Sequence, residues 1–219
     1  MPFPGPVAVL ASGGLDSAVL VADLATSGHQ VTPIYVRFGL AWEDVEVAHL
    51  ERFLASLDGV TVEPLVVLDQ PVGDVYGAHW SVTGRDVPDD GSSDDAVYLP
   101  GRNLLLLAKS SVWCALNGVP TIALGTLAAN PFPDADHAFF GAFSSLAGKA
   151  LGCPLEVVTP FAGRAKDEVV KGGQQFALDL TFSCIAPRDR HHCGRCNKCA
   201  ERRLAFERLG LEDTTEYAG

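Results

Sequence analysis

Short apolar segments alternate with helical segments along most of the chain, and this alternation constrains the fold more than any other feature. The apolar, often β-branched runs lie at residues 7–11, 31–38, 60–68, 121–124 and 155–158. Apolar residues recur at helical spacing between them, over residues 18–28, 42–57, 102–116 and 139–151. Strands that alternate with helices pair in parallel, because each helix carries the chain back across the sheet. The sequence therefore predicts an α/β fold whose mostly parallel sheet is covered by helices on both faces.

Two regions depart from this alternation. Residues 69–98 contain seven Asp and one Arg among several Gly, Pro and Ser residues, which predicts an acidic excursion from the sheet. Residues 183–208 are basic, with seven Lys or Arg against three acidic residues. We therefore expect an α/β domain over residues 1–182, with an insertion at 69–98, and a separate C-terminal module over 183–219.

The charge balance of the whole chain limits its partners. The 219 residues include 27 acidic and 16 basic residues, a formal net charge of -11, which argues against a general nucleic-acid or membrane-surface binder. Residues 1–14 contain no Lys or Arg and three prolines, unlike a signal peptide. Gly, Pro and Asn divide the charge-free run at residues 110–133, so it does not read as a membrane span. We expect a cytoplasmic protein with no membrane contact and no nucleic-acid partner.

A glycine-containing turn joins the first predicted strand to the first predicted helix. Its residues are Ser12, Gly13, Gly14, Leu15, Asp16 and Ser17. Unpaired backbone N–H groups and the positive end of the helix dipole make such a turn an anion site, and glycines let the backbone approach a phosphate closely. The spacing matches neither the Walker loop nor the dinucleotide-binding glycine motif. The alternative is a tight turn in which Asp16 or Ser17 only caps the helix.

Four of the six cysteines lie within 16 residues near the C-terminus, at Cys184, Cys193, Cys196 and Cys199. Two overlapping Cys-x-x-Cys steps and one upstream cysteine are typical of a closed, tetrahedral, structural Zn²⁺ site. An iron-sulfur cluster, a redox dithiol and unrelated buried cysteines are the alternatives. Because four thiolates complete the coordination of zinc, we interpret the neighbouring His191 and His192 as surface residues.

The hexapeptide Ser-Gly-Gly-x-Asp-Ser resembles the pyrophosphate loop of the adenine nucleotide hydrolase-like ATP pyrophosphatases. The chain as a whole resembles, nearly end to end, the 7-cyano-7-deazaguanine synthase family of queuosine biosynthesis. Besides the hexapeptide, the features that carry this resemblance are the cysteine cluster, residues 100–103, Gly125 and the segment that contains Lys166. The resemblance implies a Rossmann-like fold, an ATP-dependent ligase that forms carbon-nitrogen bonds, and a homodimer.

The same resemblance implies a reaction and roles for individual residues. ATP would adenylate the carboxylate of 7-carboxy-7-deazaguanine, ammonia would displace AMP, and a second ATP would convert the amide to the nitrile. Residues 12–17 would hold the pyrophosphate, with Asp16 helping to bind phosphate or Mg²⁺. Arg102 and Lys166 are candidate cations for the charge that develops on the phosphates. The alternative for both is an ordinary charge on the surface of a helix.

The segment at residues 130–134 follows the fourth predicted strand, at the sheet edge where open α/β proteins bind ligands. Phe132 is a candidate to stack on the deazaguanine, and Asp134 to accept hydrogen bonds from its N1–H and 2-amino groups. A proline-rich connecting loop is the alternative.

The acceptor half departs from the family pattern. Residues 37–40 are Arg-Phe-Gly-Leu where the family has Asp-Tyr-Gly-Gln, and the family's motif after the fourth strand is shortened at 132–136. Three other functions therefore stay open: a related ligase that adenylates another carboxylate or conjugates a deazaguanine, a tRNA-modifying enzyme, and a non-catalytic nucleotide-binding protein with structural zinc.

Overall fold

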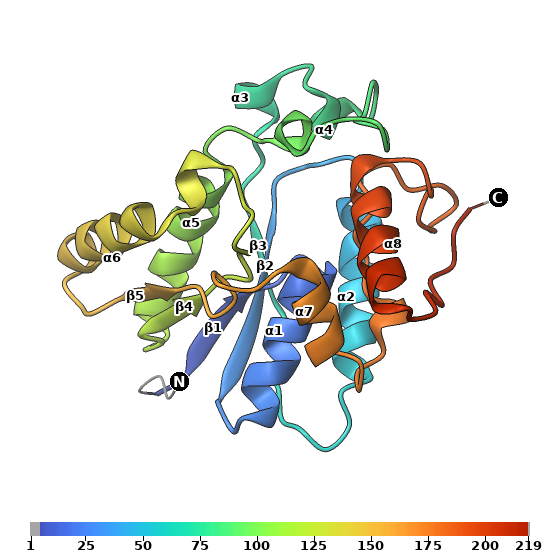
Figure 1. The fold of residues 1–219 in the computed structure, drawn as a ribbon. Helices are drawn as coiled ribbons and strands as arrows, with labels where there is room; N and C mark the ends of the chain where they lie inside the picture. Colours follow the sequence, from blue (N-terminus) through green and yellow to red (C-terminus); the bar gives the residue numbers. More distant parts are fainter. Residues whose placement is uncertain (1–4, 219) are drawn as a thin grey trace.

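The computed structural model describes residues 5–218, so residues 1–4 and 219 of the predicted domains lie outside it. Five strands form one parallel sheet in the order β3-β2-β1-β4-β5 (Figure 1). The strands are β1 (Val7–Leu10), β2 (Val31–Arg37), β3 (Val66–Asp69), β4 (Thr121–Ala123) and β5 (Glu156–Val158). The strand order reverses between β1 and β4, because the chain adds strands first on one side of β1 and then on the other. The predicted parallel α/β fold is confirmed.

Helices occupy the predicted segments, with ends that differ by a few residues. The longer ones are α1 (Leu15–Thr26), α2 (Glu43–Ala55), α5 (Arg102–Leu116), α6 (His137–Leu151), α7 (Lys166–Gly172) and α8 (Asn197–Leu209). The short helices are α3 (Gly73–Tyr76) and α4 (Trp80–Thr83), and the 3-10 turns are η1 (Asp94–Val97), η2 (Pro133–Ala135) and η3 (Leu178–Leu180). No helix within residues 5–218 is long and apolar enough to cross a membrane.

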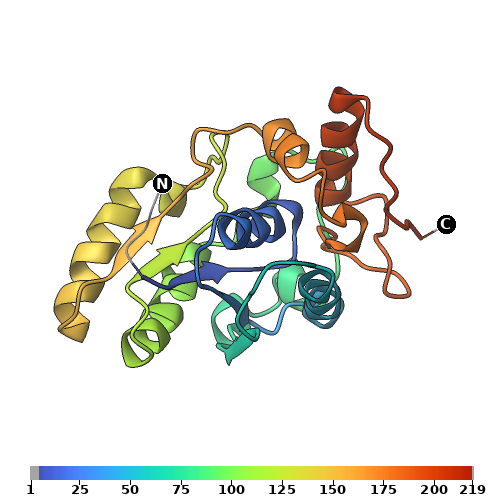
Figure 2. The ribbon, with the colours of Figure 1, turned by 90° about the horizontal axis from the view of Figure 1, so that it is seen from below.

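Successive residues of β1 point to opposite faces of the sheet and join different hydrophobic clusters. Val7 and Val9 pack with side chains of α1, α2 and α7, whereas Ala8 and Leu10 pack with side chains of α5 and α6. Figure 2 shows α1 and α5 on opposite sides of the sheet. The sheet is therefore buried on both faces, which explains why its central strands are almost wholly apolar.

The third strand is shorter than predicted. Only residues 66–69 form a ladder with β2, and the earlier part of the predicted strand at 60–68 makes a single isolated bridge between Val62 and Val31. Pro64 lies between the two regions and has no N–H group to donate to a ladder. The first half of the strand prediction was therefore wrong.

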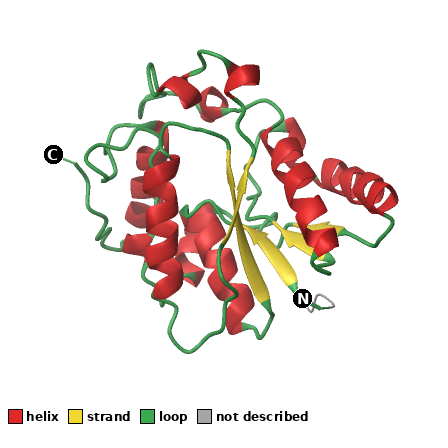
Figure 3. Cartoon of the chain, turned by 180° about the vertical axis from the view of Figure 1, so that it is seen from behind, coloured by secondary structure: helices red, strands yellow, loops and turns green. Residues whose placement is uncertain are grey.

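The insertion at residues 69–98 leaves the sheet after β3 and crosses one end of the strands (Figure 3). Its apolar residues Val72 and Val97 are buried in the same cluster as Ile122 of β4 and the four clustered cysteines. The hydrophobic core is thus continuous across residue 183. The division into a domain and a separate module stays a prediction.

Candidate functional site

The turn after β1 is closed by its own hydroxyl groups. Ser12 N donates a hydrogen bond to Ser17 Oγ at 3.2 Å. The Ser17 hydroxyl donates in turn to the Gly14 carbonyl at 3.2 Å. Gly14 N donates to Ser12 Oγ at 3.3 Å. Gly13 has a φ of 84°, and a Cβ atom there would lie 3.1 Å from Leu50 Cβ, so a larger residue would strain the backbone and crowd α2. The turn therefore holds the N-terminus of α1 in a fixed position at an anion-binding geometry.

A cavity of about 290 Å³ lies beside this turn, at the carboxyl ends of β1 and β4 where the strand order reverses. Open α/β sheets bind ligands at such a point. Its polar and charged lining residues are Ser12, Asp16, Ser17, Asp94, Arg102, Asn103, Thr126, Asn130 and Glu201. The apolar wall includes Leu106, Leu124 and Phe132. Segments from the start, middle and end of the chain thus meet around one space.

Gly125 brings two of these segments close together. A Cβ atom at this position would lie 3.2 Å from the carbonyl carbon and oxygen of Asp16 and 3.3 Å from Ser17 N. The end of β4 therefore packs directly on the backbone of the phosphate loop, which we define as residues 12–17. Only glycine allows this approach without displacing the loop.

Lys166, the first residue of α7, connects two carboxylates. Its Nζ lies 2.6 Å from Asp16 Oδ2 and 3.2 Å from Glu201 Oε1, and Lys198 Nζ lies 2.7 Å from Glu201 Oε2. Burial disfavours the charge on Lys166, but the two carboxylates raise its pKa above the ordinary value. Burial opposes the charge on Glu201 as well, yet the two lysines lower its pKa to about 2. Lys166 and Glu201 are therefore both charged at neutral pH.

Asp16 belongs both to this cluster and to the cavity, whereas Lys166 lies outside the cavity lining. Within residues 5–218, the second oxygen of Asp16, Oδ1, is buried and has no hydrogen-bond partner. A buried carboxylate oxygen without a partner is costly unless a ligand or cation satisfies it. The structure thus brings Asp16 and Lys166 together and leaves one Asp16 oxygen available.

Arg102 also lines the cavity, at the start of α5. Its Nε is buried, with no hydrogen-bond partner among the described residues. The acidic residue that interacts electrostatically with it is Glu46 of α2, which is buried and hydrogen-bonded to the Tyr35 hydroxyl. Burial raises the pKa of Glu46 to about 7, although Arg102 and the Tyr35 hydrogen bond lower it. Arg102 is therefore not an ordinary surface charge.

Phe132 and Asp134 have different surroundings. Phe132 lines the cavity and stacks on Tyr98 of the insertion, with ring centroids 4.9 Å apart at 27°. Asp134 is buried outside the cavity lining, and its carboxylate accepts from Asn103 N at 2.9 Å. The Asn103 side chain also donates to the Asp134 carbonyl at 3.0 Å. Asp134 thus fixes the first turn of α5, and its contact with a guanine edge stays a prediction.

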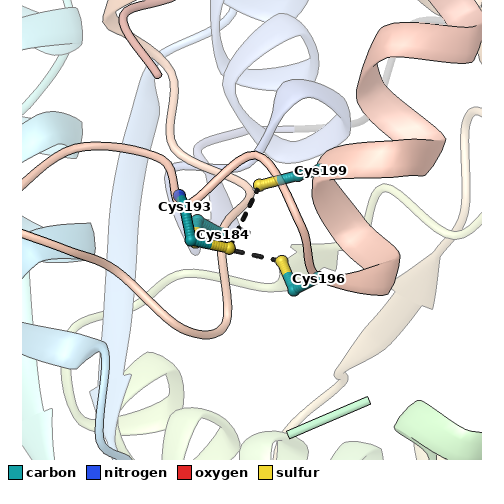
Figure 4. Close-up of side chains that lie close together, drawn as sticks. All are labelled: Cys184, Cys193, Cys196 and Cys199. Atoms are coloured by element: carbon teal, nitrogen blue, oxygen red, sulfur yellow. Dashed lines mark hydrogen bonds between the residues drawn. The ribbon is translucent and has the colours of Figure 1, made fainter. Parts of the chain in front are cut away.

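The four clustered cysteines form a compact sulfur site (Figure 4). Their Sγ atoms all lie within 4.8 Å of one another, with Cys184 and Cys196 separated by 3.9 Å and Cys193 and Cys199 by 4.0 Å. Two sulfurs bound tetrahedrally to one zinc ion lie about 3.8 Å apart, given a Zn–S bond of about 2.3 Å. The cluster is buried and suits a metal ion, as the sequence predicts.

Backbone N–H groups also point at these sulfurs. The N–H groups of Ala186 and Cys193 donate to Cys184 Sγ at 3.4 and 3.2 Å, and that of Arg195 donates to Cys193 Sγ at 3.4 Å. The hydrogen bond with Cys196, together with burial, raises the pKa of the Cys184 thiol. The four buried cysteines can therefore all be deprotonated together only when a bound cation compensates the negative charge of the thiolates.

His192 is buried, so its interpretation as a surface residue was wrong. Its ring packs against Phe182 and Tyr217, and Nε2 accepts from Ser183 N at 3.1 Å. Burial lowers the pKa of His192 to about 3, so the ring is neutral. His191 is exposed, as predicted. Adjacent residues in an extended segment point to opposite sides, and the sequence alone does not say which one faces the core.

Arg202 of α8 is fully buried and ties the cysteine-containing segment to the α/β part. Its guanidinium donates to Thr181 Oγ1 and the Leu178 carbonyl at 2.7 Å, and to Thr215 Oγ1 at 2.8 Å. One of the basic residues that make residues 183–208 positive is therefore internal. It cannot contact a nucleic acid.

Several site residues had no distinguishing signal in the sequence. Asp94 is one of seven aspartates in the insertion, and Glu201 is one acidic residue in a charged helix. Glu46 lies in a helix where acidic residues normally face solvent. Each becomes recognisable only through the residues that the fold places beside it.

The comparisons with known proteins agree with this geometry. A model of the family described as queuosine biosynthesis protein QueC matches residues 7–210. The 7-cyano-7-deazaguanine synthase of Methanothermobacter thermautotrophicus is 32% identical over 94% of this chain and 96% of its own length. The 7-cyano-7-deazaguanine synthase of Sulfolobus acidocaldarius is 31% identical over 96% of this chain. This chain spans about half, 47%, of the length of that relative.

A solved structure shares the fold. A predicted subunit of a tRNA methyltransferase from Methanocaldococcus jannaschii superposes with a TM-score of 0.51 over 95% of this chain and 89% of that chain. The two sequences are 16% identical, so this likeness concerns the fold alone.

Proposed function

The chain belongs to the family of the queuosine biosynthesis protein QueC, and on this premise we propose that it makes 7-cyano-7-deazaguanine from 7-carboxy-7-deazaguanine, ammonia and ATP. It is thus an ATP-dependent ligase that forms carbon-nitrogen bonds. The observation that carries the proposal is the single cavity in which the phosphate loop faces a wall that contains Arg102 and Phe132. A nucleotide and a planar carboxylate can meet there.

The reaction consists of two adenylations. In the first, a carboxylate oxygen attacks the α-phosphorus of ATP, the bond to the bridging oxygen breaks, and pyrophosphate leaves. Ammonia then attacks the acyl carbon, AMP leaves with the carbon-oxygen bond electrons, and one proton is lost to give the amide. In the second, the amide oxygen attacks the α-phosphorus of another ATP and pyrophosphate leaves. Cleavage of the carbon-oxygen bond then releases AMP, and loss of the two N–H protons leaves the nitrile. Both adenylations place new negative charge on pyrophosphate, so one phosphate site serves both.

The phosphate loop and two cations are suited to stabilise that charge. The backbone N–H groups at the N-terminus of α1 supply hydrogen-bond donors for the pyrophosphate, and the Ser12 and Ser17 hydroxyls hold the loop in place through their mutual contact. Arg102 lines the same cavity, where its unpartnered Nε is free to donate. Lys166 fixes one oxygen of Asp16 and so holds a positive charge beside the loop.

Asp16 is the residue suited to hold Mg²⁺. Carboxylate and phosphate oxygens are the ligands that Mg²⁺ prefers, and Asp16 Oδ1 is a buried acceptor with no partner among residues 5–218. Bound Mg²⁺ neutralises charge on the phosphate oxygens of ATP. The chain's own contribution is to hold this carboxylate between the loop and Lys166.

Zn²⁺ is the metal that we assign to the four cysteines. Four buried thiolates in tetrahedral spacing leave no open position for a substrate, so the site is structural, with one ion per chain. Metal analysis of the purified protein is expected to give about one equivalent of zinc. Iron in place of zinc would contradict the assignment. Reduced cysteines of this kind also support a cytoplasmic location.

A homodimer is the assembly that we propose. Leu104, Val112 and Leu116 are exposed and lie along one face of α5, at intervals of eight and four residues, which supports burial of this face against a second copy. The molar mass in solution, measured by light scattering, tests this proposal.

Mass spectrometry of the product tests the proposed function. The protein is incubated with 7-carboxy-7-deazaguanine, ATP, Mg²⁺ and ammonia, and the nitrile is the expected product. Pyrophosphate release is measured in parallel for Asp16→Ala, which we expect to lower the rate by about a hundredfold or more. Asp23→Ala, on the same helix but outside the cavity lining, is the matched control.

Each other outcome identifies a different function. Amide without nitrile would indicate an enzyme that performs only the first half of the reaction. Pyrophosphate release only with another carboxylate would indicate a related ligase with a different acceptor. Absence of pyrophosphate release with every acceptor would contradict an enzymatic role.

A further inference from the structure

The carboxylates that line the cavity differ in their partners. Asp16 is paired with Lys166, and Glu201 with Lys166 and Lys198. Asp94 is exposed at the cavity lining, the described residues supply no cation for it, and its Oδ1 accepts a hydrogen bond from Asn197 Nδ2 at 3.5 Å. Asp94 is therefore the one lining carboxylate, among residues 5–218, that has no lysine or arginine partner.

The insertion that carries Asp94 is fastened to the cysteine-containing segment. The N–H of Asn197 donates to the Pro88 carbonyl at 3.0 Å, and that of Asp90 donates to the Arg195 carbonyl at 2.9 Å. The Asn197 side chain donates to the Ser92 carbonyl at 2.9 Å. Asn197 and Arg195 flank the cysteine ligand candidate Cys196, so the cysteine cluster fixes the loop that ends at Asp94.

The same loop contributes an aromatic surface to the cavity. Tyr98 follows η1 and stacks on Phe132, which lines the cavity wall. Arg102 begins the next helix and lines the cavity as well. A planar ligand between the phosphate loop and Phe132 would thus have an aromatic ring, a cation for its carboxylate and the Asp94 carboxylate around it.

We propose that Asp94 determines acceptor specificity by accepting hydrogen bonds from the N–H edge of the planar acceptor. This inference rests on the proposed function, since it concerns the acceptor in that reaction. The sequence suggested that Asp134 accepts these hydrogen bonds, and we assign this role to Asp94 instead. The Asp134 carboxylate already accepts a hydrogen bond from Asn103 N and lies outside the cavity lining.

The chemistry of the two groups is complementary. The guanine-type edge presents two adjacent donors, N1–H and the 2-amino group, and an ionised carboxylate has two acceptor oxygens in a plane. An adenine-type edge presents one acceptor and one donor, so its ring nitrogen would face a carboxylate oxygen. A site built around Asp94 therefore favours the guanine-type acceptor and rejects the adenine-type one.

Equilibrium binding tests the inference separately from catalysis. Calorimetry with 7-carboxy-7-deazaguanine and a non-hydrolysable ATP analogue compares the wild type with Asp94→Asn. We expect the acceptor to bind about tenfold to a hundredfold more weakly to the variant, because the amide has one acceptor oxygen in place of two and carries no charge. Affinity for the ATP analogue alone is expected to stay within about twofold. Asp95→Asn, an adjacent exposed aspartate outside the cavity lining, is the matched control.

A second ligand measures specificity directly. 7-Carboxy-7-deazaadenine is expected to bind the wild type more weakly than the guanine analogue does, and Asp94→Asn to reduce this preference. Equal acceptor affinities for the wild type, Asp94→Asn and Asp95→Asn would overturn the inference even if the nitrile is formed. Weaker binding by Asp94→Asn alone, with no nitrile from any variant, would support the inference and contradict the proposed function. A wild type that does not bind the deazaguanine would overturn both.

Discussion

The two sides of the cavity are built in different ways. The phosphate side consists of one contiguous segment, residues 12–17, whose hydrogen bonds are mostly internal and whose orientation follows from the end of β1 and the start of α1. The acceptor side consists of Asp94, Arg102, Asn130 and Phe132, which come from three separate segments. The first side depends on local backbone geometry, whereas the second depends on long-range packing.

The cysteine-containing segment supports both sides, but by different contacts. Immediately before this segment, Phe182 N donates to the Gly13 carbonyl of the phosphate loop at 2.7 Å. Asn197 holds the insertion that carries Asp94. Glu201 holds Lys166 against Asp16. The segment that contains the four cysteines is therefore linked to both sides of the cavity.

Loss of a cysteine ligand is expected to break both sides at once. Cys196→Ser removes one thiolate, and structural zinc contributes roughly 10 kcal/mol or more in small zinc-binding peptides, comparable with the total stability of a domain, about 5–15 kcal/mol. We expect loss of bound zinc and of most soluble protein, measured by metal analysis and thermal unfolding. Cys153→Ser, at a half-buried cysteine outside the cluster, should have little effect. Metal-free Cys196→Ser protein with the wild-type unfolding temperature would refute the structural role.

Substitution of Gly13 is expected to break the phosphate side alone. Gly13→Ala places a Cβ 3.1 Å from Leu50 Cβ and 3.2 Å from the Glu46 carbonyl, in a residue with positive φ. We expect ATP to bind about tenfold more weakly because the loop must shift, and stability to fall by about 1–2 kcal/mol. Acceptor affinity, measured by calorimetry, should change less.

Gly28 offers a control for the backbone strain. Gly28 has a φ of 86°, but a Cβ atom there would meet nothing within 4 Å. Gly28→Ala should therefore show the stability loss without the loss of ATP affinity. Equal ATP affinities for the two variants would mean that the crowding at Gly13 does not matter.

Glu46 lies where the two sides meet, since its carbonyl is near Gly13 and its carboxylate faces the charge of Arg102. Because its pKa is raised from 4.5 to about 7, the folded protein keeps a proton that the unfolded chain loses. Its ionisation therefore lowers stability as the pH rises from about 4.5 to 7.

Glu46→Gln should remove this pH dependence. Between pH 4 and pH 8, the difference in free energy of unfolding between the variant and the wild type should therefore shift in favour of the variant by up to about 3 kcal/mol. Denaturant unfolding at several pH values measures it, with the exposed Glu51→Gln on the same helix as control. Parallel stability profiles for Glu46→Gln and the wild type would contradict the raised pKa. The expected effect on ATP binding is small, because the Glu46 side chain does not line the cavity.

The regions that the sequence predicts well are those in which contiguous residues carry the information. The strand-turn-helix at the N-terminus, the alternation of elements and the spacing of the cysteines all depend on residues close together in the chain. A prediction was wrong where one residue interrupts an otherwise strand-like pattern. Pro64 does so in the predicted third strand at residues 60–68, of which only the part from residue 66 onward pairs with β2 in a ladder. Another was wrong where two neighbours compete for the core, as His191 and His192 do.

By itself the sequence determined a parallel α/β sheet and a compact cluster of four cysteines, and it predicts that the turn at residues 12–17 binds an anion, because periodicity, ligand spacing and glycine conformation are local properties. Only the tertiary structure decided which charges face one another. It placed Asp94 in the cavity, gave Asp134 to Asn103 and enclosed Lys166 between Asp16 and Glu201. These pairings join residues tens to more than a hundred positions apart, and no local pattern in a single sequence specifies which of many similar acidic residues the fold brings to the site.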